Sequence, residues 1–262
     1  MGKATSATEA ASAIDDGATV AITGSGGGLL EADAVMAAIE ARFLATGHPR
    51  DLTLVHALGV GDGGGSGVGR FAHEGLVRRV IGGHWAWAPA MQALARDNLI
   101  EAYVLPAGVL STLFREIGAG RPGVTTEVGL GTFVDPDHGG GKANDSAGED
   151  LVERVMFDGR PYLRYKPFPI DIGIIRASHA DSCGNLSLQR EPADLDAYAV
   201  ALAAHNSGGQ VIAQVGALSD APILPARMAS IPGVLVDHIV HYPEQMQTHA
   251  GAHDPALSGE VA

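Results

Sequence analysis

Short apolar runs alternate with glycine turns and amphipathic stretches along most of the chain. The apolar runs are rich in β-branched and aliphatic residues, which favours buried strands. Strands are expected at Thr19–Ile22, Leu52–Leu58, Arg79–Ile81, Ala102–Leu105, Ile170–Ile175, Gln210–Val215 and Val234–Val240. Helices are expected at Thr5–Ile14, Glu31–Leu44, Trp87–Asp97, Leu110–Ile117 and Asp194–Ala204. This alternation predicts an α/β fold, an open and mainly parallel sheet flanked by helices, with ligands at the carboxyl ends of its strands.

Two segments interrupt this rhythm. Arg121–Asp150 is rich in Gly and Pro, which predicts an extended surface segment or lid, and Val152–Lys166 alternates around an Asp-Gly turn typical of a hairpin. We therefore expect one α/β domain over residues 1–242, with a small lid and hairpin insertion at 121–168. Periodicity ends after Tyr242, so residues 243–262 are interpreted as a connector.

Two glycine-rich loops follow predicted strands at the ligand-binding edge. Gly26, Gly27 and Gly28 could turn unshielded backbone N–H groups toward an anion and form an oxyanion hole, but a tight strand-to-helix turn explains them equally well. In the second loop, glycines 59, 61 and 64 satisfy G-x-G-x-x-G. The ribose-binding acid of a dinucleotide site is missing downstream, so we interpret this segment as a flexible loop that closes over a pocket instead of a dinucleotide site.

Other candidate chemistry is sparse. His56, Gly61, His84 and Trp85 lie at or just after strand ends and are candidates for lining a substrate pocket. The chain has 11 histidines, but no pair has a convincing ligand spacing, so no metal site is expected. No serine has glycine at both i−2 and i+2, so the sequence lacks the Gly-x-Ser-x-Gly nucleophile elbow of α/β-hydrolases.

Charge and composition exclude several partners. The 262 residues carry 17 Lys+Arg against 30 Asp+Glu, a formal net charge of −13. Such a chain is repelled by nucleic acid and by anionic membrane surfaces. A single cysteine allows no internal disulfide, and no signal segment or long apolar run is visible, so we expect a cytoplasmic protein.

Several stretches, in the same order along the chain, resemble family I coenzyme A transferases. The similarity is to the acyl-CoA:acetate/3-ketoacid and propionate CoA-transferase group. The matching stretches are Asp16-Gly17 followed by Thr19–Gly24, then Arg50–Leu54, His73–Val77, Ile81–Trp85, Gly129–Pro136, Asn206–Gly209 and Pro232–Asp237.

The resemblance implies an α/β half that works beside a second, similar half or β subunit. In this family a glutamate of the second half attacks an acyl-CoA thioester and carries CoA as a glutamyl-CoA thioester. Because the resemblance assigns this glutamate to the second half, this chain is expected to be inactive alone. Coenzyme A is then a substrate, with small carboxylates as acceptors; no permanently bound cofactor and a higher oligomer are expected.

The resemblance also assigns the backbone oxyanion hole to Gly26, Gly27 and Gly28. Here the turn lacks the family's usual bulky residue and following proline, so the amide that faces the thioester oxygen stays open. Two alternatives stay open as well. One is a same-fold hydratase or hydrolase that acts on a CoA ester without the glutamate, and the other is a ligand-sensing domain, against which the acidic balance argues.

Overall fold

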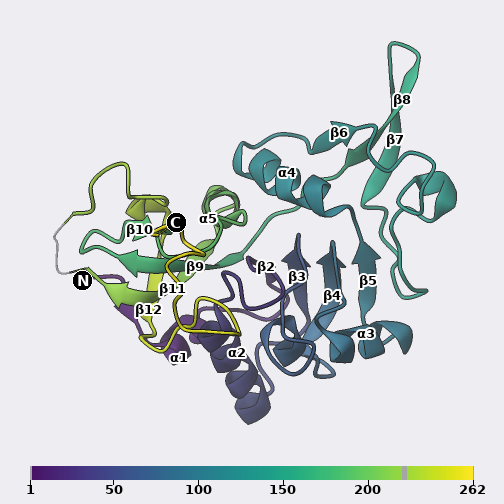
Figure 1. The fold of residues 1–262 in the computed structure, drawn as a ribbon. Coiled ribbons are helices and arrows are strands. Elements are labelled where there is room, and N and C mark those ends of the chain that lie inside the picture. The colour runs from purple at the N-terminus through teal and green to yellow at the C-terminus, as the bar shows by residue number, and fades with distance from the viewer. Residues whose placement is uncertain (1, 220–222, 262) are drawn as a thin grey trace.

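The computed structural model describes residues 2–219 and 223–261, and in them one large sheet forms the centre of the molecule (Figure 1). All of its neighbouring strands run parallel except β10 (Leu186–Ser187), which pairs antiparallel with β9. From one edge to the other, the parallel strands are β1 (Ala4–Thr5), β12 (His238–His241), β11 (Gln210–Leu218), β9 (Ile172–Ala180), β2 (Thr19–Ile22), β3 (Leu52–His56), β4 (Val77–Gly82) and β5 (Glu101–Val104).

Helices cover both faces of this sheet. One face packs against α1 (Ala7–Ser12), α2 (Asp33–Thr46) and α3 (Pro89–Arg96), and the other against α4 (Ala107–Gly118) and α5 (Ala197–Asn206). Short 3-10 helices are η1 (Gly67–Phe71), η2 (Pro136–His138) and η3 (Gly233–Leu235). The predicted α/β class, with an open and mainly parallel sheet, is confirmed.

Each central strand is apolar on both sides because both faces of the sheet are covered. In β2, Val20 and Ile22 join the core under α2, while Ala21 joins the core under α5. The continuous apolar runs that predicted buried strands follow from this double burial.

The inserted segment forms a second, antiparallel sheet of β6 (Val124–Thr126), β8 (Arg160–Tyr165) and β7 (Val152–Phe157). Asp158 and Gly159 join β7 to β8 with φ angles of +49° and +76°, the geometry that makes Asp-Gly a favoured hairpin turn. The predicted hairpin is confirmed, and it projects from the body of the molecule (Figure 1).

The strand expected at Val234–Val240 is wrong in its first half. Pro232 and Gly233 lead into η3, where Val234 is 72% exposed, and the strand begins only at His238. Proline has no N–H for a sheet ladder, and the apolar run after it turns partly outward instead of entering the sheet.

The strand order reverses beside β2. The chain passes from β2 through β3 and β4 to β5, and then returns to place β9 on the other side of β2. In open parallel sheets such a reversal leaves a crevice at the carboxyl ends of the two central strands, where ligands bind. A ligand-binding site is therefore expected at the loops after β2 and β9.

Candidate active site

Two glycine loops lie at the carboxyl edge of the sheet. The first glycine loop (residues 24–30) follows β2, and the second glycine loop (residues 59–69) follows the neighbouring parallel strand β3. A glutamate joins them, because Oε1 of Glu31 accepts a 2.7 Å hydrogen bond from the N–H of Gly61. The loops thus form one assembly around the end of β2.

The first glycine loop is a closed turn. Ser25 and Leu29 exchange backbone hydrogen bonds of 2.9 and 3.2 Å. Gly27 and Gly28 have φ angles of +88° and +83°. Residues that carry a Cβ atom rarely adopt this left-handed region of the backbone. Both glycines are therefore needed for the turn itself, whatever else they do.

The same turn leaves backbone donors unused. Among the described residues, no hydrogen bond engages the N–H of Gly26, Gly27 or Gly28. The C=O of Ser25 faces Leu29, and a trans peptide points the following N–H the opposite way, so the N–H of Gly26 is directed out of the turn. Gly26 and Gly27 are partly exposed, whereas Gly28 is buried. The first two amides are thus the more accessible to a ligand.

Three of the four predicted pocket residues meet beside the second glycine loop. His56, His84 and Trp85 line one small cavity there, which is too narrow to admit a water molecule. Gly61 lies outside that lining; its φ of +133° and the backbone oxygen of Trp87, 2.7 Å from where a Cβ would stand, account for the glycine. The role of these four residues in substrate binding stays a prediction.

His56 is neutral in this setting. Its Nδ1 donates to the backbone oxygen of Leu58 over 2.8 Å, which leaves Nε2 as the unprotonated nitrogen. Burial, with a smaller contribution from His84, lowers the pKa of His56 from 6.5 to about 4. A buried neutral imidazole can accept a hydrogen bond but cannot carry positive charge near neutral pH.

Trp87 was missed by the sequence analysis. A Cβ on Gly26 would lie 2.1 Å from Nε1 of Trp87, and one on Gly59 would lie 2.7 Å from its Cδ1. The indole therefore sits directly on both glycine loops while 41% of the residue remains exposed. Only its place near a strand end could have indicated this position.

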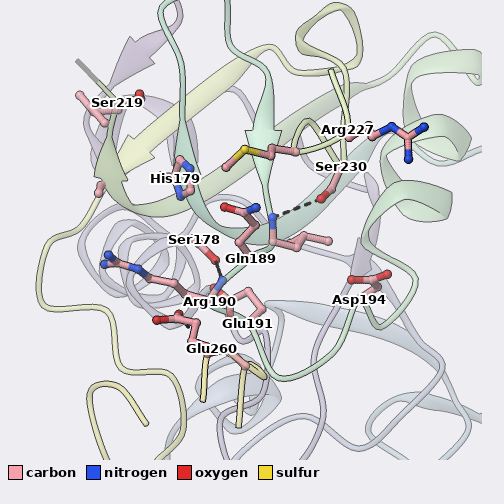
Figure 2. Close-up of a pocket in the computed structure, with 15 residues that line it drawn as sticks. Ser178, His179, Gln189, Arg190, Glu191, Asp194, Ser219, Arg227, Ser230 and Glu260 are labelled. Atoms are coloured by element: carbon pink, nitrogen blue, oxygen red, sulfur yellow. Dashed lines mark hydrogen bonds between the residues drawn. The ribbon is translucent and has the colours of Figure 1, made fainter. Parts of the chain in front are cut away.

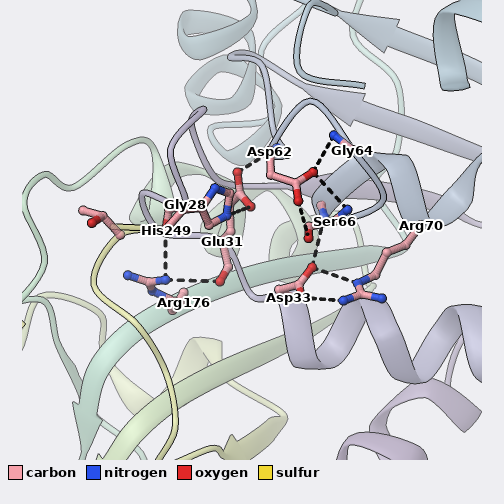
Figure 3. A network of polar contacts seen from close by, with 12 residues as sticks. Gly28, Glu31, Asp33, Asp62, Gly64, Ser66, Arg70, Arg176 and His249 are labelled. Carbon is pink, nitrogen blue, oxygen red and sulfur yellow. Dashed lines mark hydrogen bonds and ion pairs between the residues drawn. The ribbon is translucent and has the colours of Figure 1, made fainter. Parts of the chain in front are cut away.

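A buried charge network supports the first glycine loop from below (Figure 3). Arg176 of β9 is 3% exposed, pairs with Glu191 through a 2.6 Å contact between Nη2 and Oε2, and donates from Nη1 to the carbonyl of Gly28 at 3.1 Å. Glu31 is 2% exposed, and burial raises the pKa of its carboxyl. An arginine within a run of isoleucines was the available signal for this network.

A larger cavity of about 810 Å³ opens at the carboxyl ends of β9 and β11. Figure 2 shows its polar lining, which includes Ser178 and His179 of β9, Arg190 and Asp194. Glu191 belongs both to this lining and to the pair with Arg176. The cavity and the first glycine loop are thus connected by one buried ion pair.

Two structural features are absent from the described residues. No group of three or more His, Cys, Asp or Glu side chains in them is arranged to hold a metal ion. His249 and His253, four residues apart, contact two different glutamates, Glu31 and Glu260 respectively. No helix in the described ranges has the length and apolar character needed to cross a membrane.

Comparisons with known proteins agree with this architecture. A family model described as coenzyme A transferase matches residues 4–242. The crystal structure of the acyl-CoA transferase YdiF from Escherichia coli O157:H7, in a thioester complex with CoA, superimposes with a TM-score of 0.97 at 40% identity, over 99% of this chain and 54% of that one.

Two curated relatives extend the comparison. The caffeate CoA-transferase of Acetobacterium woodii is 42% identical over 265 residues, which cover all of this chain and 50% of the relative. The α subunit of an Escherichia coli K12 acetate CoA-transferase is 27% identical over 67% of this chain and 71% of the subunit. The chain spans about half the length of the curated relatives that it matches first.

Proposed function

The chain belongs to the coenzyme A transferase family, and we propose that it is the first half of an enzyme that moves CoA from an acyl-CoA to a short-chain carboxylic acid. The three glycine amides left unengaged at the carboxyl edge beside the strand reversal carry this proposal. A thioester carbonyl placed there would receive hydrogen bonds as its oxygen becomes negative. One such donor contributes about 3 kcal/mol to the transition state.

The proposed reaction uses a glutamate from a second half. Its carboxylate attacks the thioester carbonyl, CoA leaves as a thiolate, and an acyl-glutamyl anhydride forms. The thiolate then attacks the glutamyl carbonyl and releases the first carboxylic acid. The acceptor carboxylate repeats the sequence in reverse on the glutamyl-CoA thioester and leaves as the new acyl-CoA. Each step forms and breaks one acyl bond, and no oxidant or metal is consumed.

The glutamates near the candidate site support a nucleophile from elsewhere. Glu31 is buried and accepts from Gly61, and Glu191 is buried against Arg176. A carboxylate held in this way cannot reach a thioester without breaking its buried contacts, which costs several kcal/mol. In this proposal His56, Gly61, His84 and Trp85 line the substrate path, and the second half completes it.

CoA exchange between an acyl-CoA and free acetate or propionate tests the proposal. We expect no exchange with this chain alone and exchange after a second half that carries the Glu-x-Gly motif is added. Borohydride added after acyl-CoA should then inactivate the mixture, because it reduces a glutamyl-CoA thioester. The matched control is a second half with Gln in place of that Glu, which should bind the chain and give no exchange.

Two outcomes would contradict the proposal. Exchange by this chain alone would place the nucleophile within it. Hydration or hydrolysis of acyl-CoA by the mixture, without transfer to acetate, would keep the fold assignment and remove the transferase.

A further inference from the structure

The segment after β12 is docked on the candidate site. This C-terminal strap, residues 242–254, begins where the N–H of Tyr242 bonds to the carbonyl of Val215 at 2.8 Å. Nε2 of Gln245 then donates to the carbonyl of Ala177 at 2.9 Å. The strap therefore crosses the carboxyl ends of β11 and β9 and continues toward the loop after β2. In Figure 1 it is the yellow segment that passes beside α2.

Gln247 anchors the middle of the strap. It is 5% exposed, and its carbonyl accepts from Nη2 of Arg176 at 3.1 Å. Its side chain donates to the carbonyl of Arg190 at 2.7 Å and accepts from the N–H of Asp254 at 2.7 Å. A buried amide with its donor and acceptor both engaged holds one conformation, because releasing it would leave buried polar groups unpaired.

His249 carries the strap onto the first glycine loop. Its backbone N–H donates to the carbonyl of Gly27 at 2.7 Å, and its ring lies against Gly28, where a Cβ would come within 2.5 Å of Cδ2. Its Nε2 lies 3.3 Å from Oε2 of Glu31, as Figure 3 shows. The backbone bond fixes the peptide between Gly27 and Gly28, because C=O and the next N–H point in opposite directions.

We propose that the C-terminal strap is a positioning element for the oxyanion-binding loop, and that the backbone N–H of His249 is its point of action. Glycine loops are intrinsically mobile, so the unengaged amides need outside restraint to stay aimed at one point. Arg176 restrains the carbonyl of Gly28 and His249 restrains that of Gly27. The peptide between Gly26 and Gly27 lies between the restrained carbonyl of Gly27 and the indole of Trp87, which contacts Gly26. The catalytic consequence rests on the proposed function.

A pair of substitutions separates the backbone bond from the side chain. His249→Pro removes the N–H that holds Gly27, whereas His249→Ala keeps it and removes only the ring. With a second half present, we expect His249→Pro to lower kcat by about 100-fold with a smaller change in KM for acyl-CoA, the effect of misplacing catalytic donors. His249→Ala keeps the backbone N–H that holds Gly27, so its kcat should stay within about fivefold of wild type. His253→Ala, altered at a ring that contacts Glu260 instead, is the matched control.

A second readout needs no turnover. In a Trp85→Phe background, Trp87 is the remaining tryptophan of two, and it lies on Gly26. When the strap no longer holds the first glycine loop, Trp87 should become more accessible to acrylamide. Quenching of the Trp87 fluorescence should therefore rise in His249→Pro and in Gln247→Ala but not in His249→Ala. Gln247→Ala frees the strap without introducing proline, which covers the case in which His249→Pro does not fold.

The outcomes separate the two proposals. Absence of exchange in the wild-type mixture removes the proposed function, while the quenching comparison still tests the strap. Wild-type quenching in both His249→Pro and Gln247→Ala would overturn the strap proposal. Equal losses of kcat in His249→Pro and His249→Ala would overturn it too, because the backbone N–H would then have no separate role.

Discussion

The pH dependence of protein stability tests whether His56 is buried beside the candidate site. His56 is 2% exposed, and its pKa is lowered from 6.5 to about 4, first by burial. A histidine with a depressed folded-state pKa contributes stability that is complete above the unfolded value and is lost as pH falls toward the folded value. Between pH 7.5 and pH 5 the unfolded state takes up nearly one more proton than the folded state. The integrated loss is about 2 kcal/mol.

His56→Asn is the informative variant. The Asn amide nitrogen occupies the position of Nδ1 and can keep the bond to the carbonyl of Leu58, but it does not titrate. The smaller side chain leaves a cavity whose cost is the same at both pH values. Urea unfolding at pH 7.5 and pH 5 should therefore show wild type losing about 2 kcal/mol more than the variant, since other groups cancel in the difference.

Parallel losses in wild type and variant would refute this reasoning. They would mean that His56 is protonated about as readily in the folded as in the unfolded state, and hence that it is reached by water. The small cavity beside the second glycine loop would then be open rather than closed.

Three further predictions concern the loops and their supports. Gly26→Ala should lower the unfolding temperature because its Cβ would lie 2.1 Å from the Trp87 ring. Most of that decrease should disappear when Trp87 is also replaced by Ala, and decreases that simply add in the double variant would contradict the contact. Arg176→Met leaves Glu191 buried without its 2.6 Å partner and should cost about 3–5 kcal/mol in urea unfolding, part of which Glu191→Gln should restore. Burial raises the pKa of Glu31, so this group's contribution to stability is complete below the unfolded pKa and lost as pH rises through the folded one. Glu31→Gln should therefore gain stability relative to wild type between about pH 4 and pH 8, and an unchanged difference would contradict the buried charge.

Local patterns in the sequence predicted the elements well. Strands such as Leu52–His56, buried on both faces, appear as runs of mainly aliphatic and β-branched residues. The Asp158-Gly159 turn has a backbone requirement that few residue pairs meet. Where local chemistry misled, as at Val234, an apolar residue followed a proline turn and stayed at the surface. The glycines of the first loop were recognisable as a turn or a donor site, because either use demands the absence of a side chain.

The supports of that loop were decided only by the tertiary structure. Arg176 contacts Gly28, and His249 contacts Gly27, across most of the length of the chain. These contacts exist because β9 returns to lie beside β2, a pairing that local periodicity does not encode. The segment after Tyr242 has no periodicity because its order comes from polar bonds to the sheet edge instead of an apolar face. The sequence by itself thus determined the elements and the position of the glycine turn, while the folded topology determined which distant residues hold that turn in place.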